Sequence, residues 1–273
     1  MGRAKDIIIR PISPQDARAV ISKIHYSGTY KNNSQIHLGV FLYGRLEGAL
    51  QFGPPIDRSK LIHLVEGTKW NGFMELNRMA LSDRLPKNSE SRSISVAMKV
   101  LKKYKPSLEW IVSFSDAAQC GHGTIYQASG FVLTGIKESK NLARFKDGKV
   151  RHQIMFNCHG GNLKKHDFLG GKSYIELTEG GYDWNKFLKK AGAKILKGFQ
   201  LRYLYFLNKK AKSRLTVPIL PFSVIDEKNA RMYKGQRCVA SDTSDTSPDQ
   251  GGKGRAELTA TLYQTTDINP EVI

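Results

Sequence analysis

Cysteine is scarce in this sequence, and long apolar runs are absent. The three cysteines, Cys120, Cys158 and Cys238, are widely spaced and form no Cys-x-x-Cys pair, which excludes a disulfide framework and a zinc ribbon. We therefore expect reduced thiols. No run reaches the roughly 18 apolar residues of a membrane span, and the first residues, Met-Gly-Arg-Ala-Lys-Asp, lack the apolar region of a secretory signal. A cytoplasmic protein with no membrane partner is expected, and its oligomeric state is left open, a dimer included.

Acidic residues are also few. The 24 aspartates and glutamates are outnumbered by 43 lysines and arginines, which gives a net charge of +19. Such an excess favours polyanions through steering and counterion release, so nucleic acid is the first partner to consider. The excess is uneven: residues 1–157 carry 24 basic and 12 acidic groups, residues 158–237 carry 17 and 6, and the remaining tail carries 2 and 6.

Hydrophobic patterning predicts a mixed α/β fold. The expected strands cover residues 6–10, 37–43, 46–52, 73–81, 108–116, 131–137 and 150–157, and the expected helices cover 13–25, 89–104 and 124–129. A meander followed by crossover connections gives a mixed sheet with helices on its faces. This order of elements resembles the GNAT acyltransferase fold, in which two central strands part and admit a pantetheine arm.

Three regions are predicted along the chain. Residues 1–160 form the GNAT-like catalytic domain, and residues 161–237 form a basic C-terminal extension that packs on this core and contacts DNA. The last region, 238–273, contains a stretch rich in serine, aspartate and glycine, a composition typical of disorder. We therefore expect a disordered tail.

The strongest charge run lies in residues 186–214, which hold ten basic residues and no acidic one. Interleaved aromatic residues can anchor such a segment on the core while its cations face phosphate, and this favours DNA over an internally salt-bridged surface. The alternative is an ordinary solvated face. The candidate DNA contacts are Lys189, Lys190, Lys194, Arg202, Lys209 and Lys210.

An acid, an imidazole and a phenol follow one another in residues 113–131. Asp116 ends an apolar strand, His122 lies between two glycines, and Tyr126 lies on a short helix that a glycine closes. Ligands of open α/β sheets bind outside the carboxyl ends of the strands, so this stretch is a candidate active site. The alternative is that Asp116 only caps the helix and that Tyr126 packs with its hydroxyl satisfied.

The loop at residues 85–93 is a candidate site for a cofactor phosphate. A bound acyl-CoA needs donors for its pyrophosphate, usually backbone amides at a helix start that follows a glycine-rich loop. This loop has no glycine, but Ser89, Ser91 and Arg92 could supply side-chain donors. The alternative is a serine-capped helix that binds nothing.

A charged side chain, Arg78, lies inside a predicted strand. Burying it is costly unless it is paired, so we expect it to meet an anion or a carboxylate. In a regular strand its neighbours Glu75 and Asn77 would point to the opposite face. A purely structural pairing of Arg78 with Asp116 or Glu75 is the alternative.

Taken in order, these residues resemble a known family. His25-Tyr26, Tyr43, Glu75-Leu-Asn-Arg78, Ser91 and the block from Asp116 to Tyr126 are similar to the Mom family of phage DNA adenine modification proteins, over about residues 7–160. The resemblance implies a GNAT-like transferase, encoded by a phage or prophage. It would convert the exocyclic amine of adenine in double-stranded DNA to a carbamoylmethyl derivative and so protect the DNA from restriction.

The resemblance also implies the site and its cofactors. By matching position, the catalytic residues would be His25, Tyr43, Arg78, Asp116 and Tyr126, with Ser91 on the side of the cofactor. Acetyl-CoA or another small donor and iron are implied as well. Imidazole and carboxylate suit ferrous iron, and His25, Asp116 and His122 could form such a ligand set.

Three functions remain open from the sequence. In the first, a target adenine flips into the cleft of a DNA-modifying transferase, and an aromatic residue such as Tyr26 or Tyr43 stacks on it. The second is a conventional acetyl-CoA-dependent GNAT N-acetyltransferase. The third is a phage DNA-binding protein without enzymatic activity, whose basic segment is its whole function.

Overall fold

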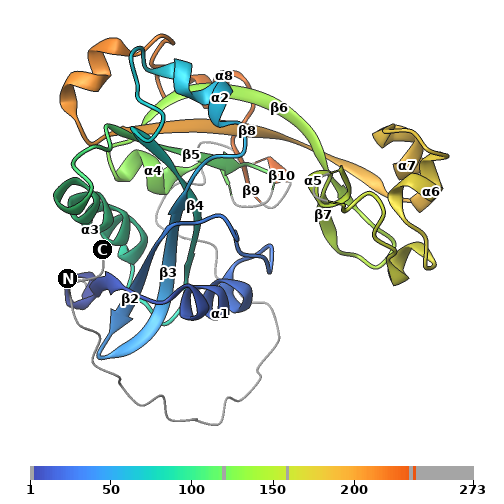
Figure 1. Ribbon diagram of the computed structural model, residues 1–273, viewed down its shortest axis with the longest axis horizontal. Helices are drawn as coiled ribbons and strands as arrows, with labels where there is room; N and C mark the ends of the chain where they lie inside the picture. The colour runs from blue at the N-terminus through green and yellow to red at the C-terminus, as the bar shows by residue number, and fades with distance from the viewer. Residues whose placement is uncertain (1–2, 119–120, 158–159, 234–235, 238–273) are drawn as a thin grey trace. The chain divides into compact units, whose positions relative to one another are not determined.

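Eight strands form one mixed sheet in the order β1-β2-β3-β4-β5-β8-β6-β7 (Figure 1). The computed structural model describes residues 3–118, 121–157, 160–233 and 236–237. Met1–Cys238 forms one compact unit. All three cysteines and the expected tail, residues 238–273, lie outside the described residues. The predicted mixed α/β sheet is confirmed.

The bounds of the elements are as follows. The strands are β1 (Ile8–Pro11), β2 (Ile36–Leu42), β3 (Arg45–Gly53), β4 (Phe73–Leu81), β5 (Trp110–Asp116), β6 (Val132–Arg144), β7 (Val150–His152), β8 (Lys194–Phe206), β9 (Met232–Tyr233) and β10 (Gln236–Arg237). The helices are α1 (Pro14–Ile24), α2 (Arg58–Leu61), α3 (Ser89–Tyr104), α4 (Thr124–Ala128), α5 (Ile154–Asn157), α6 (Tyr174–Thr178), α7 (Trp184–Ala191) and α8 (Val224–Glu227). Short 3₁₀ turns are η1 (Arg3–Asp6), η2 (Ile62–Leu64), η3 (Asp167–Leu169) and η4 (Lys209–Arg214).

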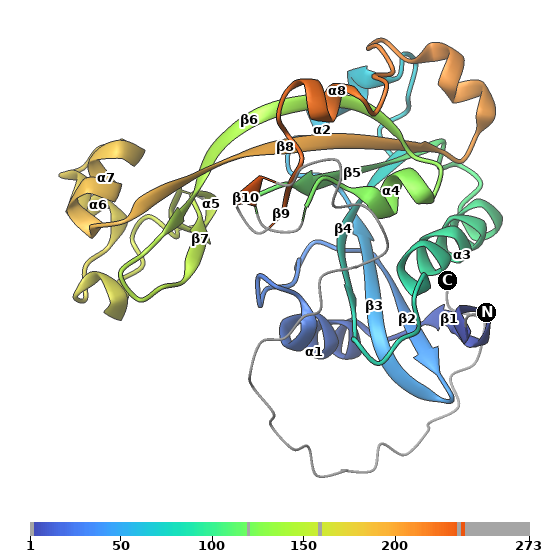
Figure 2. The same cartoon turned by 180° about the vertical axis from the view of Figure 1, so that it is seen from behind.

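Helices cover both faces of the sheet (Figure 2). Helix α1 begins where predicted, because Ser13 accepts a hydrogen bond from the Asp16 amide at 3.0 Å and Pro14 occupies its first turn. Its buried residue Ile21 packs with Ala49 of β3. Helix α3 buries a stripe at helical spacing, Ile94, Ala97, Met98 and Leu101, against the main hydrophobic core.

The strand β8 is the largest departure from the predicted organisation. It pairs antiparallel with β5 on one side and with β6 on the other, with Val112 and Val132 both opposite Leu204. Part of the expected extension, 161–237, is thus a central strand of the sheet, and no boundary falls at residue 160. Its basic residues Lys194 and Lys197 are exposed, whereas Leu204 is fully buried.

The connection from β6 to β8, residues 145–193, packs around a second hydrophobic cluster that also includes Ala143 of β6 and Ile195 of β8, and we call this connection the lobe. Its buried residues are Phe145, Phe156, Leu169, Tyr174, Phe187 and Leu188. A turn at Asp147-Gly148 joins β6 to β7, and the Gly148 amide donates to the Phe145 carbonyl at 3.0 Å. The strand expected over 150–157 is shorter than predicted: β7 ends at His152 and α5 follows, because the apolar residues after it turn into the core of the lobe.

Among the described residues, the structure contains no helix with both the length and the apolar character that crossing a membrane requires.

Candidate active site

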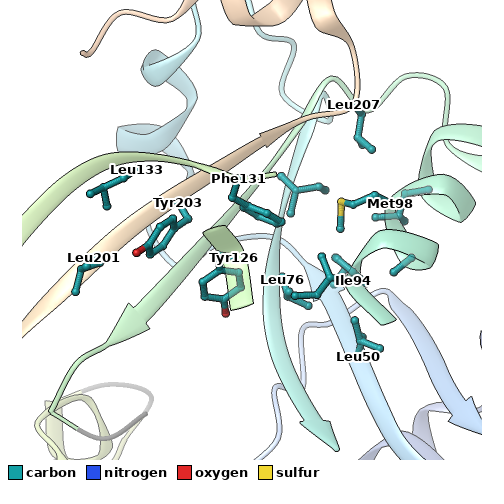
Figure 3. Close-up of a cluster of buried hydrophobic side chains, with 14 of the residues drawn as sticks. Leu50, Leu76, Ile94, Met98, Tyr126, Phe131, Leu133, Leu201, Tyr203 and Leu207 are labelled. Carbon is teal, nitrogen blue, oxygen red and sulfur yellow. The ribbon is translucent and has the colours of Figure 1, made fainter. Parts of the chain in front are cut away.

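The two parallel strands β4 and β5 stay together for only three residue pairs, from Phe73 opposite Trp110 to Glu75 opposite Val112. Beyond this point β4 remains paired with β3 and β5 with β8. The centre of the sheet therefore opens into a fork whose arms are the carboxyl ends of β4 and β5. Figure 3 shows Tyr126 between these two diverging strands, beside Leu76.

A bulge in β4 changes where its side chains point. Leu76 faces Phe52, but Arg78 faces Gln51, so Asn77 is an extra residue in the strand. In a regular strand, Glu75 and Arg78 would point to opposite faces, but the extra residue removes this opposition. The two charges interact, and Arg78 acts to lower the pKa of Glu75. A bulge that redirects side chains is common next to active sites.

The loop after α1, residues 25–35, lies over this arm of the fork. The Nε atom of Arg78 donates to the Thr29 carbonyl at 3.2 Å, and its Nη1 atom donates to the Asn77 carbonyl at 2.8 Å. The hydroxyl of Ser34 donates to Oδ1 of Asn77 at 3.0 Å. These bonds fix the guanidinium of Arg78 at the fork.

His25 stands next to Arg78 and is a neutral imidazole. Burial, and then the charge of Arg78, lower the pKa of His25 to about 4. Its Nδ1 atom accepts a hydrogen bond from the Ser27 amide at 3.2 Å. The neutral ring therefore carries its proton on Nε2 and can donate one hydrogen bond from that atom.

Two further groups of this cluster, Lys31 and His152, were not predicted from the sequence. His152 comes from the strand β7 at the base of the lobe. Its pKa is lowered first by burial and then by the charges of Lys31 and Arg78. Its Nδ1 atom accepts from the Ile154 amide at 3.0 Å, so its neutral ring also carries the proton on Nε2. No local pattern singles out either residue, because the fold brings them together from distant segments.

Glu75 is the acid of the cluster. Burial raises the pKa of Glu75 to about 7, although Lys31, Arg78 and a hydrogen bond from Asn77 all act to lower it. The fork thus combines one buried carboxyl group with two cations and two neutral imidazole donors. Of the predicted catalytic residues, the structure brings His25 and Arg78 together here.

Asp116 ends β5, on the other arm of the fork. Burial raises the pKa of Asp116 to about 6, against a hydrogen bond that its Oδ1 atom accepts from the Ala118 amide at 3.0 Å. The alternative of a helix cap is not what the structure shows, because the N-cap of α4 is Gly123. Asp116 instead closes the turn that follows its own strand.

Tyr126 is buried beside Asp116's strand in the main core. Its ring lies 5.3 Å from that of Phe131 and 5.2 Å from that of Tyr203, measured between centroids. The hydroxyl of Tyr203 in turn donates to the His122 carbonyl at 2.5 Å. This packing holds the His122 turn and α4 against the sheet.

The side chain of His122 is engaged by the C-terminal part of the unit. Its Nε2 atom lies 3.2 Å from Nη1 of Arg231 and 3.0 Å from the hydroxyl of Thr124. Arg231 is itself held by Asp226 through two bonds of 2.5 and 2.8 Å. Burial, followed by the charge of Arg231, lowers the pKa of His122.

The predicted iron ligands, His25, Asp116 and His122, do not form a metal site. Among the residues that the structure describes, no group of three or more histidine, cysteine, aspartate or glutamate side chains is placed to hold a metal ion. His122 meets a guanidinium, and Nδ1 of His25 meets the Ser27 amide. The donor set does not fit a resident iron.

Tyr43 and Tyr26 are placed differently from each other. Tyr43 lies at the tip of the β2–β3 hairpin with φ at 49° and a hydroxyl 3.5 Å from Asp6. Gln51, the β3 residue opposite Arg78, is six positions from Arg45, where β3 begins after the hairpin tip. Six positions correspond to roughly 20 Å along the strand. Tyr43 is therefore not brought to the fork. Tyr26 is exposed next to the fork, and the centroid of its ring lies 4.2 Å from that of His25.

The predicted cofactor side chains lie at the start of α3. The hydroxyl of Ser89 donates to the Pro86 carbonyl at 2.6 Å, and that of Ser91 donates to the Asn88 carbonyl at 3.2 Å, whereas Arg92 is exposed. Asn88 adopts φ of 70°, and its side chain does not cap the helix. Both serine protons are thus used within the turn, and the first amide of α3, that of Ser89, donates to the Pro86 carbonyl at 3.1 Å.

Several cations of the basic segment serve the structure itself. Arg202 donates to the carbonyl and the hydroxyl of Thr134, at 2.9 and 3.1 Å. Arg214 pairs with Glu109 at 2.5 Å. Arg202 is half-buried and holds β8 to β6, so it is not placed as a surface contact for DNA.

The lysines of the segment are mostly exposed. Lys190 lies 3.8 Å from Glu179, an acid outside the segment, in an exposed ion pair, and such a pair contributes little to stability. The exposed candidates are Lys189, Lys190 and Lys194 around the lobe, and Lys209 and Lys210 in η4.

Comparison with known proteins decides the family. The model of the Mom protein family matches residues 6–224. The chain belongs to the Mom protein family. The methylcarbamoylase Mom of Escherichia phage Mu is 39% identical to it over 217 residues, which cover 79% of this chain and 82% of that protein. The predicted family is therefore confirmed, and the match extends beyond residue 160 through β8.

Solved structures with some similarity are GNAT acetyltransferases. A GNAT family acetyltransferase from Elizabethkingia anophelis with acetyl-CoA bound is 17% identical, with a TM-score of 0.33, over 50% of this chain and 81% of that one. The ribosomal-protein-S18-alanine N-acetyltransferase of Escherichia coli is 8% identical, with a TM-score of 0.39, over 74% of this chain and 94% of that one.

Proposed function

We propose that this protein is a DNA-modifying transferase that converts the exocyclic amine of adenine in double-stranded DNA to a carbamoylmethyl derivative and so protects phage DNA from restriction. The observation that carries the proposal is the 39% identity, over 79% of the chain, to a protein named methylcarbamoylase. The fork between β4 and β5 lies within the matched residues and offers the groups that such a reaction needs.

The cluster on the β4 arm fits the transferred group. Arg78, Lys31 and the Nε2 atoms of His25 and His152 are all hydrogen-bond donors, and both imidazoles stay neutral at physiological pH because their pKa values are lowered. A cluster rich in donors recognises a carbonyl or carboxylate oxygen. We assign it to the oxygen of the carbamoylmethyl group or of its donor.

The β5 arm fits the proton transfer. Forming a bond between adenine N6 and a donor carbon requires that N6 lose a proton, and Asp116, with a pKa of about 6, is mostly an accepting carboxylate at pH 7.5. As the N6–carbon bond forms, the bond between that carbon and the leaving group of the donor breaks; the N6 proton passes to Asp116, and the leaving group takes a proton from the Tyr126 hydroxyl. Stacking on the exposed ring of Tyr26, beside His25, would hold the flipped base.

The donor itself is proposed only as a small molecule that carries the carbamoylmethyl group on a leaving group, because acetyl-CoA, which the family resemblance implies, has neither the amide nitrogen nor a leaving group on its methyl carbon. The parting of β4 from β5 leaves their facing edges unpaired with each other, where an extended arm could bind, and the start of α3 has no side-chain cap that would compete with a phosphate. A conventional N-acetyltransferase would bind acetyl-CoA tightly without DNA. An acetyl-transfer assay with an amine acceptor and no DNA separates that function from the proposed one, because its product is an acetylated amine, whereas the proposed function yields a carbamoylmethyl adenine.

The exposed lysines provide the proposed DNA surface. Replacing Lys209 and Lys210 by glutamine should weaken duplex binding about equally for all sequences and reduce the salt dependence of the affinity by roughly two phosphate contacts. Arg202→Gln should instead destabilise the sheet, because its bonds go to Thr134. Fluorescence anisotropy at several salt concentrations measures the first effect, and thermal unfolding the second.

The deciding experiment is mass spectrometry of nucleosides from the DNA of cells that express the protein. A carbamoylmethyl adenine should appear with the wild-type protein and be absent with Asp116→Ala. Only plain adenine and methyladenine would overturn the proposal. A non-enzymatic DNA-binding protein predicts instead that Asp116→Ala leaves the phenotype intact while loss of the lysines abolishes it.

A further inference from the structure

Glu75 lies at the vertex of the fork. It is the last residue of β4 that pairs with β5, where it is opposite Val112, and Gly53 of β3 is its partner on the other side. A Cβ atom on Gly53 would lie 2.7 Å from Oδ1 of Asn77. The glycine therefore lets the Asn77 side chain lie against β3, close to Glu75.

Glu75 and Asp116 point to the same face of the sheet. The rings of Phe73 and Trp110, the pair two residues before Glu75 and Val112, stack with their centroids 4.2 Å apart, so opposite residues of β4 and β5 share a face. Because side chains alternate along a strand, Asp116, four residues after Val112, lies on that face too. Four residues span roughly 13 Å. Two carboxyl side chains with a transferred group of a few atoms between them can bridge such a separation.

The side chain of Asn77 has a defined orientation beside Glu75. Its Oδ1 atom accepts a hydrogen bond from the Ser34 hydroxyl at 3.0 Å, so its amide nitrogen is the group that donates to the Glu75 carboxylate. Arg78 donates from Nε and Nη1 to the main-chain carbonyls of Thr29 and Asn77. Glu75 is thus oriented by a neutral amide, and these two donors of Arg78 are directed to the main chain instead.

A primary amide needs both a donor and an acceptor from its site. Its oxygen accepts hydrogen bonds, and its nitrogen donates two. Arg78 and Nε2 of His25 can donate to the oxygen, but they would serve a carboxylate at least as well. Glu75 adds the acceptor that a carbamoyl group requires. It also opposes a carboxyl group, because two adjoining carboxylates fit together only if one of them takes up a proton.

We propose that Glu75 determines the specificity for the carbamoylmethyl group: its carboxylate accepts a hydrogen bond from the amide nitrogen, while Arg78 and His25 donate to the amide oxygen. The transferred carbon then lies toward Asp116, which takes the proton of adenine N6. A carboxymethyl group is rejected by its charge. This inference rests on the proposed modification of adenine in duplex DNA.

The test compares two product duplexes of one sequence. One carries a single N6-carbamoylmethyl adenine and the other a single N6-carboxymethyl adenine, each in an A·A mispair that is cheap to open. Fluorescence anisotropy with the full-length protein is measured at pH 8, where a carboxyl group with a pKa of about 7 is ionised. We expect the wild-type protein to bind the carbamoylmethyl duplex about 10-fold more tightly, because the site then keeps a hydrogen bond to a charged group.

The Glu75 variants separate specificity from a structural role. Glu75→Gln keeps the shape and removes the charge, so the preference should fall to about 2-fold or less, because a neutral amide can either accept or donate. Glu75→Asp keeps the charge at a shorter reach, so it should bind the carbamoylmethyl duplex more weakly but still prefer it. Thermal unfolding verifies that both variants are folded.

Glu66→Gln is the matched control. It removes the same charge from an exposed side chain that precedes β4, at the end of the strand away from the fork, and should keep the wild-type preference. Equal affinity of the wild-type protein for the two modified duplexes, or an unchanged preference in Glu75→Gln, would overturn the inference. Absence of carbamoylmethyl adenine from the DNA of cells that express the wild-type protein would overturn the proposed function instead.

Discussion

Arg231 donates a hydrogen bond to Nε2 of His122, which lies 109 residues earlier in the chain, at 3.2 Å. Because a guanidinium can only donate, the acceptor nitrogen carries no proton and the imidazole is neutral, with its proton on Nδ1. The carboxylate of Asp226 accepts two hydrogen bonds from the same guanidinium, from its Nε and Nη2 atoms. The segment around α8 thus sets the protonation state of a ring in the turn that follows Asp116.

Replacing Arg231 by alanine should loosen this turn. The pKa of His122 should rise, since the charge of Arg231 now lowers it, and kcat should fall by roughly 10-fold, the worth of about one hydrogen bond to a charged group. NMR titration of the His122 ring gives the pKa. Arg231→Lys keeps the charge without the planar fork of donors, so it should preserve most of the pKa shift but not the full rate. A His122 pKa that does not move would contradict the relationship.

The rate of modification should depend on pH through Asp116. If this carboxylate accepts the N6 proton, kcat/KM rises with pH and levels off above the pKa of about 6. Asp116→Asn should abolish activity, and Asp116→Glu should keep a reduced activity with a displaced midpoint. Initial rates between pH 5 and 8.5 provide the profile. A flat profile for the wild-type protein with chemistry rate-limiting would exclude this role.

Stability should depend on pH through Glu75. Its folded pKa of about 7 lies above the ordinary value of 4.5, so the folded state holds the proton more tightly than the unfolded chain. Stability contributed by Glu75 is therefore present below about pH 4.5, declines as the pH rises toward 7, and stays lost above. The Tm of Glu75→Gln relative to wild type should accordingly increase from pH 4.5 to 8. The substitution also removes a charge partner of Lys31 and Arg78, which adds a constant offset to the Tm difference between variant and wild type. The readout is therefore the slope of that Tm difference with pH.

Gly123 should tolerate no side chain. It has φ of +87°, and a Cβ atom there would lie 2.6 Å from Cε2 of Tyr203, a buried ring fixed by its bond to the His122 carbonyl. We expect Gly123→Ala to lower the free energy of unfolding by about 2 to 4 kcal/mol, from strain and clash together. Gly148 is the matched control, because its φ is +77° but a Cβ atom there meets nothing within 4 Å. Urea unfolding of both variants should show the smaller loss for Gly148→Ala.

The local parts of the fold could be predicted from the sequence. The helices at 13–25 and 89–104, the strands at 37–43 and 46–52 and the strand end at Asp116 depend on neighbouring residues, and periodicity and turn residues report them. The strand β8 could not be predicted in this way. Its lysines indicate a solvent-exposed segment. Its central position in the sheet depends on pairing with β5 and β6, and no local sequence pattern indicates that pairing.

The site was predictable only in part for the same reason. His25 and Arg78 were identified by resemblance to a family, and the structure brings them together at the fork. Lys31 lies in an irregular loop and His152 in a short strand of the lobe, so neither stands out in the sequence. The bulge at Asn77, which redirects Arg78, has no sequence signature that separates it from a regular strand.

The central position of β8 also has a consequence for how the chain folds. Until Phe206 has been synthesised, β5 and β6 each keep an open edge, and open edges invite pairing with other chains. The lobe lies between β6 and β8 in the sequence, and its aromatic core also takes in Ala143 of β6 and Ile195 of β8. Formation of this core brings the first residues of β8 next to β6, which shortens the effective loop that β8 must close and makes its pairing a local step.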